Sequence, residues 1–158
     1  MFLVAGLGNP GEEYALTPHN LGFLTLDRLA ERHGFRITRK DSKALTGLGE
    51  IGGREVMLAK PQTYMNLSGT SLAPLMEKHA IAVSDLIVVY DELDLPWGSL
   101  RIKPRGSAAG HNGMKSVIQS LQTSDVVRVR IGVHPGHPLN GGTAVSYTHL
   151  TLPTNREV

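Results

Sequence analysis

MFLVAGLGNPGEEYALTPHN, residues 1–20, is the stretch that decides the fold of this 158-residue chain. It opens with the apolar run 2–5, which predicts a buried strand that starts the chain inside a core. The glycine-rich segment 6–11 then predicts irregular backbone, and His19 follows at the expected start of a helix. Many α/β proteins place their functional residues in this way, at the carboxyl edge of a sheet. We therefore take His19 as the centre of a candidate site.

The glycines of this stretch also match the dinucleotide-binding fingerprint G-x-G-x-x-G, at Gly6, Gly8 and Gly11. That fingerprint requires a helix that opens on the glycines, so that its amide groups can receive a pyrophosphate. Here Pro10 interrupts the loop, and the glutamates at 12–13 place negative charge where the phosphate would sit. The local sequence therefore disfavours a nicotinamide or flavin site.

The composition indicates one globular domain without disulfides. Hydrophobic residues make up 41% of the chain and charged residues 19%, and there is no cysteine. We find neither an apolar run long enough to span a bilayer nor a signal peptide before the first strand, which favours a cytoplasmic protein.

Positive charge is concentrated in one segment, although the net charge of the chain is only +2. Residues 101–130 carry six lysines and arginines against a single acid, Asp125, which gives a local net charge of +5. An excess of this size favours a polyanionic partner such as an RNA backbone or a 5′-phosphate. A solvated basic face without a partner is the alternative on charge alone.

Apolar periodicity predicts an alternation of strands and helices. The elements expected after the first strand are a helix that begins near Asn20 and ends before Gly34, a hairpin of strands 44–50 and 55–59, a helix from about residue 67 to 79, a strand at 86–90, an edge strand at 100–103, a helix at 114–122 and a strand at 126–133. Asn20 or Thr17 is the expected N-cap of the first helix. This order predicts the α/β class, a single domain with a twisted, mixed and mostly parallel sheet covered by helices on both faces.

Four polar residues follow predicted strands or lie in the loops beyond them: Asn9, Asn66, Asp91 and Asn112. We expect them to converge with His19 at one edge of the sheet. Asp91 would then fix the tautomer of His19, whose other ring nitrogen takes a proton from water. The asparagine amides would donate to an oxyanion or orient the substrate. Since no Ser or Cys occupies a nucleophile turn such as G-x-S-x-G, direct attack of water on an ester fits better than a covalent acyl-enzyme.

Other interpretations of the same residues stay open. A histidine at a helix start often serves only as a cap or a surface residue, and asparagines in glycine-rich loops often serve turn geometry. Asp91 and Asp94 with His111 form an alternative set of metal ligands. However, the sequence contains neither H-E-x-x-H nor a helical His-x-x-x-His spacing.

Six motifs follow one another from residue 1 to about residue 137. They are Gly6-Leu7-Gly8-Asn9-Pro10-Gly11, Tyr14, His19-Asn20, KPQTYMNLSG at 60–69, DELDLP at 91–96 and Gly110-His111-Asn112-Gly113. In their order and spacing, these motifs resemble those of bacterial peptidyl-tRNA hydrolases.

The resemblance implies a monomeric enzyme, without metal or cofactor, that cleaves the ester between a peptide and the terminal ribose of tRNA. Such an enzyme releases tRNA from peptidyl-tRNA for reuse in translation. His19 matches the family's catalytic base and Asp91 the carboxylate that orients it. The residues that match substrate-binding positions are Asn9, Tyr14, Tyr64, Met65, Asn66, His111 and Asn112. Lys103 and Arg130 match the basic pair that holds the tRNA 5′-phosphate, in agreement with the +5 segment.

A non-catalytic RNA-binding protein on the same scaffold, as in the family's plant organellar splicing-factor relatives, is the alternative function. RNA binding alone would not need His19, Asp91 and the asparagines together. The presence of the whole set therefore favours the enzyme.

Residues 138–158 depart from the family's pattern. Family members continue into a lid segment, another strand and a C-terminal helix, and this tail resembles none of them. We therefore expect a catalytic domain at 1–137, without the usual lid and C-terminal helix, followed by a foreign tail at 138–158.

Overall fold

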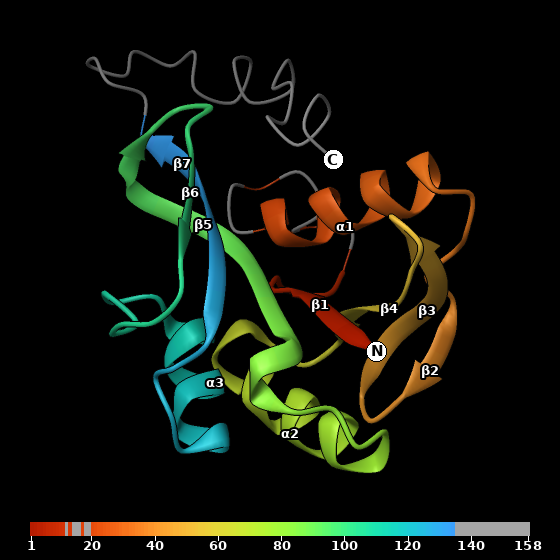
Figure 1. Ribbon diagram of the computed structural model, residues 1–158. Helices are drawn as coiled ribbons and strands as arrows, with labels where there is room; N and C mark the ends of the chain where they lie inside the picture. The colour runs from red at the N-terminus through yellow and green to blue at the C-terminus, as the bar shows by residue number, and fades with distance from the viewer. Residues whose placement is uncertain (12, 14–16, 18–19, 135–158) are drawn as a thin grey trace.

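The strands form one sheet with β1 at its centre. The computed structural model describes residues 1–11, 13, 17 and 20–134, and seven strands in these residues pair in the order β2-β3-β4-β1-β5-β7-β6 (Figure 1). Their bounds are β1 Phe2–Gly6, β2 Arg39–Asp41, β3 Ala44–Ile51, β4 Arg54–Pro61, β5 Leu86–Pro96, β6 Leu100–Lys103 and β7 Val127–His134. The central strands β4, β1, β5 and β7 are parallel, and antiparallel pairs lie at both edges. The sheet is therefore mixed, as the sequence predicts.

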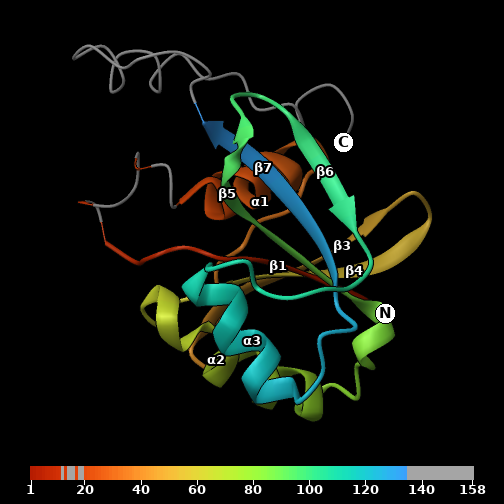
Figure 2. The ribbon, with the colours of Figure 1, turned by 90° about the vertical axis from the view of Figure 1, so that its left-hand side faces the viewer.

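Helices cover both faces of this sheet (Figure 2). α1 (Leu21–Arg32) packs on one face, where its buried residues join apolar side chains of β4, β5 and β7. α2 (Ser68–Lys78) and α3 (Asn112–Leu121) pack together on the other face over a second core. Gly34 follows α1 with φ 76°, the left-handed conformation common after a helix. The predicted α/β fold is confirmed, and no helix in the described part of the chain is long and apolar enough to cross a membrane.

The β3–β4 hairpin and its turn also follow the prediction. Ile51 pairs with Arg54, so only Gly52 and Gly53 form the turn. Their φ angles of 59° and 77° are those of the two-residue turns whose twist matches that of the strands. The short strand β2 is not predicted from the sequence, because all its residues are charged and carry no apolar pattern.

β5 is longer than the predicted strand 86–90, which corrects the position of its acidic residues. The strand continues to Pro96, so Asp91 and Glu92 lie inside it and pair with β7. Pairing with β1 stops at Val89. The second half of β5 extends beyond β1, and its carboxylates line a pocket there.

α1 lies directly against β1 because glycines stand where the two elements cross. A Cβ atom on Gly6 would lie 2.4 Å from the carbonyl oxygen of Gly22. A Cβ atom on Gly22 would lie 2.5 Å from the carbonyl oxygen of Leu7. Side-chain rotation cannot relieve either contact, since the neighbours are backbone atoms. The first glycine of the opening stretch therefore serves helix–strand packing.

We expect Gly22→Ala to destabilise the protein, although alanine is the better helix former by about 1 kcal/mol. The added methyl group would meet backbone atoms of Leu7 and Val89 at 2.5–2.6 Å, and overpacking of this kind costs about 1–3 kcal/mol. Urea unfolding would measure the loss, with Arg28→Ala on the exposed side of α1 as the control. A variant as stable as the wild type would show that the packing cost only offsets the helix-propensity gain. A variant more stable by about 1 kcal/mol would show that α1 can shift from β1 without cost.

A buried carboxylate fastens β2 to the end of α2. Asp41 Oδ1 accepts hydrogen bonds from Lys78 Nζ and Ser42 Oγ, both at 3.0 Å. His79 Nε2 lies 2.9 Å from Asp41 Oδ2, and the Asp41 side chain is 5% exposed. The hydrogen bonds from His79 and Lys78 lower the pKa of Asp41 from 3.8 to about 2. The fold therefore favours the ionised carboxylate.

The stability that Asp41 provides should depend on pH in the acid range. Because folding lowers the pKa, this contribution is complete above a pH of about 3.8 and is lost as the pH falls through about 2. Asp41→Asn should therefore lower the melting temperature by about 2–4 °C near neutral pH and by progressively less in acid. Thermal unfolding across this range measures the effect, with the exposed Asp125→Asn as control. A difference that stays constant with pH would contradict the expectation.

Candidate active site

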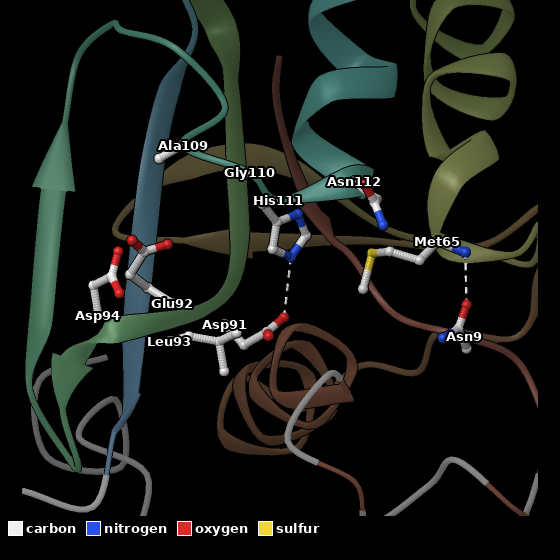
Figure 3. A pocket seen from close by; sticks show the side chains of 10 residues that line it. All are labelled: Asn9, Met65, Asp91, Glu92, Leu93, Asp94, Ala109, Gly110, His111 and Asn112. Carbon is white, nitrogen blue, oxygen red and sulfur yellow. Dashed lines mark hydrogen bonds and ion pairs between the residues drawn. The ribbon is translucent and has the colours of Figure 1, made fainter.

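A polar pocket opens where β1 ends and the second half of β5 continues (Figure 3). Its volume is about 490 Å³. The residues that line it are Asn9, Met65, Asp91, Glu92, Leu93, Asp94, Ala109, Gly110, His111 and Asn112. They come from the loop after β1, the 3₁₀ turn Met65–Leu67, the second half of β5, the loop before α3 and the first residue of α3. Five residues predicted for the site are therefore brought together here.

Asn9 presents its side-chain amide to the pocket in one fixed orientation. Its Oδ1 accepts a hydrogen bond of 2.6 Å from the backbone N–H of Met65 (Figure 3). With Oδ1 engaged, the Nδ2 group is the end of the amide that can donate to a ligand in the pocket. Such a donor suits a carbonyl oxygen on which negative charge develops.

Asn20 fixes the backbone of Asn9 instead of capping α1 with its side chain. Asn20 Oδ1 accepts a hydrogen bond of 2.7 Å from the Asn9 N–H, and Asn20 Nδ2 donates to the Asn9 carbonyl at 2.8 Å. Asn20 is 2% exposed, so water competes little for these bonds. It stands at the N-cap position, one of the two predicted, but makes no side-chain cap hydrogen bond. The sequence gives no sign of this role, since the contact joins residues 11 positions apart.

Asp91 and His111 form a hydrogen-bonded pair in the pocket. His111 Nε2 lies 3.1 Å from Asp91 Oδ1, and the two side chains are 9% and 1% exposed. The other ring nitrogen, Nδ1, accepts a hydrogen bond of 3.1 Å from the N–H of Met114. Because Nδ1 is an acceptor, the proton of the neutral ring lies on Nε2 and is donated to Asp91. His111 is thus the N-cap of α3, which explains why the helix begins at Asn112 and not at the predicted residue 114.

Glu92 adds a further carboxylate to the pocket, which the sequence does not identify as a site residue. Burial raises the pKa of Glu92, whereas the positive charge of Arg130 acts to lower it. The negative charges of Asp94 and Asp91 add to the upward shift of this pKa. Arg130 Nη1 lies 3.6 Å from Glu92 Oε1, which is an ion-pair distance but too long for a hydrogen bond.

The remaining predicted residues lie outside the pocket or outside the described residues. Asn66 and Tyr64 flank Met65 in the turn after β4, but both are exposed and neither lines the pocket. His19 and Tyr14 lie outside the described residues, so their roles stay predictions.

β6 and β7 form a cationic face beside the pocket, made by Arg101, Lys103 and Arg130. The strand register places Arg101 opposite Arg130 and Lys103 opposite Arg128. Like charges directly opposite each other destabilise an antiparallel pair. A polyanion bound on this face would relieve that repulsion.

Arg128 contributes to the +5 segment but is not available to a ligand. It is 1% exposed. Its guanidinium donates hydrogen bonds to the backbone carbonyls of Val126, Ser107 and Ser124 at 2.8–3.1 Å. It therefore joins the loop after β6 to the start of β7. The exposed Arg101 and Lys103 and the 15% exposed Arg130 remain for a ligand.

The second glycine of the apparent dinucleotide fingerprint also has a packing explanation. A Cβ atom on Gly8 would lie 2.7 Å from Asn20 Oδ1 and 2.9 Å from the ring of Phe23. Protein atoms therefore fill the space beside this glycine. The geometry supports packing of α1, and not a pyrophosphate, as the reason for the pattern.

The fold and the pocket define a class of protein, an α/β enzyme with polar groups gathered at the carboxyl end of a central parallel strand and a cationic face beside them. The family model described as peptidyl-tRNA hydrolase matches residues 3–154. The chain belongs to the peptidyl-tRNA hydrolase family.

Individual relatives agree with this assignment. The chain is 76% identical over 142 residues to the peptidyl-tRNA hydrolase of Solibacter usitatus, covering 90% of this chain and 72% of that protein. It is 48% identical over 147 residues to the Bacillus subtilis protein of the same name, covering 93% and 77%. The crystal structure of peptidyl-tRNA hydrolase from Acinetobacter baumannii matches with a TM-score of 0.80 at 36% identity, covering 99% of this chain and 79% of that one.

Asn20→Ala should loosen the pocket without removing any residue that lines it. The substitution leaves the N–H and carbonyl of Asn9 without their partners, which should lower the free energy of unfolding by about 1–3 kcal/mol. Amide hydrogen exchange at Asn9 and Met65 should also accelerate. Asn112→Ala, at an exposed position in the same pocket, is the matched control. Unchanged exchange at Asn9 would show that Asn20 does not hold the loop.

Proposed function

We propose that this protein hydrolyses the ester bond between peptide and tRNA in peptidyl-tRNA, which frees the tRNA for reuse in translation. Membership of the family supports this reaction. The observation that carries the proposal is the pocket, where the Asn9 amide is held as a donor near the Asp91–His111 pair. Donors fixed before the substrate arrives stabilise developing charge without the cost of reorganisation.

The proposed reaction uses water as the nucleophile and His19 as the general base. His19 takes a proton from water while the water oxygen attacks the ester carbonyl carbon, and Asp91 orients the imidazole. The tetrahedral intermediate then collapses, and the bond to the ribose oxygen breaks. The His19 imidazolium returns its proton to that oxygen, so the products are the free peptide acid and the tRNA. No covalent intermediate forms in this proposed reaction.

The other site residues receive proposed roles in substrate binding. Asn9 Nδ2 is the proposed oxyanion donor, because Asn9 Oδ1 is already engaged by Met65. Asn66 and Asn112 are proposed to bind the peptide and to position the water. The residues proposed to line the rest of the substrate site are Tyr14, Tyr64, Met65 and His111.

The RNA part of the substrate is proposed to bind the cationic face, with Lys103 and Arg130 on the 5′-phosphate. Charge and adjacency to the pocket support this assignment. We further propose that the protein acts as a monomer in the cytoplasm. The division at residue 137 also stays a proposal, since residues 135–158 lie outside the described residues while the family match extends to residue 154.

Release of peptide from purified peptidyl-tRNA tests the proposed reaction. His19→Ala should lower kcat/KM by about 10²–10⁴-fold, the usual contribution of a general base, while RNA binding persists. His33→Ala, at the C-cap of α1, is the control and should retain activity. A wild-type protein that binds the substrate without releasing peptide would instead identify a non-catalytic RNA-binding protein.

A further inference from the structure

We propose that Glu92 limits the affinity of this protein for RNA by competing with RNA phosphates for Arg130. Glu92 would then be a specificity-determining residue for the reaction. This inference rests on the proposed function in one respect, because it takes the cationic face of β6 and β7 as the RNA-binding surface.

The strand register places the two side chains on one side of the sheet. Tyr90 pairs with Arg130 and Glu92 pairs with Gly132, so Glu92 and Arg130 are diagonal neighbours on adjacent parallel strands. Glu92 lines the pocket, and Arg130 stands opposite Arg101 on the cationic face. Their contact is therefore the point where the pocket meets that face.

The Arg130 side chain is mostly buried beside Glu92, and its guanidinium lacks good hydrogen bonds within the described part of the chain. Its side chain is 15% exposed, and its ion pair with Glu92 spans 3.6 Å between Nη1 and Oε1. Its Nε is buried and has no hydrogen-bond partner among the described residues. A buried donor without a partner is unfavourable. A phosphate that draws Arg130 outward could instead accept two parallel hydrogen bonds from the guanidinium.

Glu92 opposes this movement because the positive charge of Arg130 stabilises its buried carboxylate. The Glu92 side chain is only 7% exposed, and the carboxylates of Asp91 and Asp94 lie in the same pocket. Burial already raises the pKa of Glu92 while Arg130 counters that shift. Removal of Arg130 would leave a buried carboxylate among like charges. RNA phosphates must therefore compete with Glu92.

The competition should lower the affinity most for RNA that contacts only the cationic face. Such RNA must displace Glu92 and gains no compensating contact in the pocket. A substrate whose ester also enters the pocket makes additional contacts there. Glu92 would thus lower binding of RNA without a peptide more than binding of the full substrate.

The test is binding of a 5′-phosphorylated RNA hairpin that mimics the acceptor stem. Glu92→Gln keeps the size of the side chain and removes its charge, so it should bind the hairpin about three- to tenfold more tightly at low salt. The logarithm of the binding constant should also fall more steeply with the logarithm of the salt concentration, by an amount equivalent to about one additional phosphate contact. Equal or weaker binding by a folded Glu92→Gln protein would overturn the proposal.

Two comparisons separate this competition from a general effect of charge. Asp94→Asn removes an equal charge from β5 at an exposed carboxylate for which the described residues show no ion pair with Arg130. It should tighten binding less than Glu92→Gln does. In an Arg130→Ala background, Glu92→Gln should have no effect. The proposal would be overturned if Asp94→Asn raised the affinity for the hairpin as much as Glu92→Gln does. It would also be overturned if Glu92→Gln still raised that affinity in the Arg130→Ala background.

The wild-type protein provides a test that does not depend on the folding of a variant. The Nε–H resonance of Arg130 in ¹⁵N-labelled protein should change as the hairpin saturates the surface, and an unchanged resonance would overturn the proposal. Binding is measured without turnover, so the two proposals can fail separately. Hydrolysis by the wild type without tighter binding by Glu92→Gln refutes only the competition. Tighter binding in a protein that releases no peptide refutes only the hydrolysis.

Discussion

The contact of α1 with β1 at backbone distance, which Gly6 and Gly22 permit, is the constraint on which the site depends. Because the helix lies so close to the strand, Asn20 at its start reaches the loop after β1 and holds Asn9 through two hydrogen bonds. Asn9 in turn accepts from Met65, which belongs to a segment far along the chain. Three separate parts of the sequence therefore meet at one residue, Asn9, through its backbone and its side chain. A longer distance between helix and strand would separate all of them, even if every polar side chain were kept.

The second organising feature is the separation of charge across two adjacent parallel strands. β5 carries carboxylates into the pocket, whereas β7 and β6 carry cations on the neighbouring face. The proposed substrate joins a reactive ester to a polyanion, so it would present one group to each of these two surfaces. The ion pair between Glu92 and Arg130 stands at the boundary between them. The strand pairing that builds the core thus also sets the distance between the pocket and the cationic face.

Elements with a local signal could be predicted from the sequence. The apolar run of β1, the hairpin closed by Gly52 and Gly53, and the α/β class all follow from periodicity and turn chemistry. The extension of β5 could not be predicted, since its pairing with β7 overrides an acidic pattern that looks like a loop. Asn20 and Glu92 were likewise missed as site residues because their partners come from distant positions. Of the four residues expected to converge with His19, Asn9, Asp91 and Asn112 line one pocket and Asn66 does not. The predicted role of His19 falls on a residue outside the described part of the chain.

His111 has two tasks that cannot be separated. One ring nitrogen caps α3 and the other donates to Asp91, while the ring packs 4.4 Å from that of Tyr90 between centroids. Helix ends unfold locally more readily than helix centres, and we expect the same of the first turn of α3. Fraying of that turn would release the ring and remove a donor from Asp91 in the same event. The ordered pocket therefore lasts only as long as the first turn of α3 stays folded. Local unfolding of that turn would disorder the pocket for a short time while the sheet stays folded.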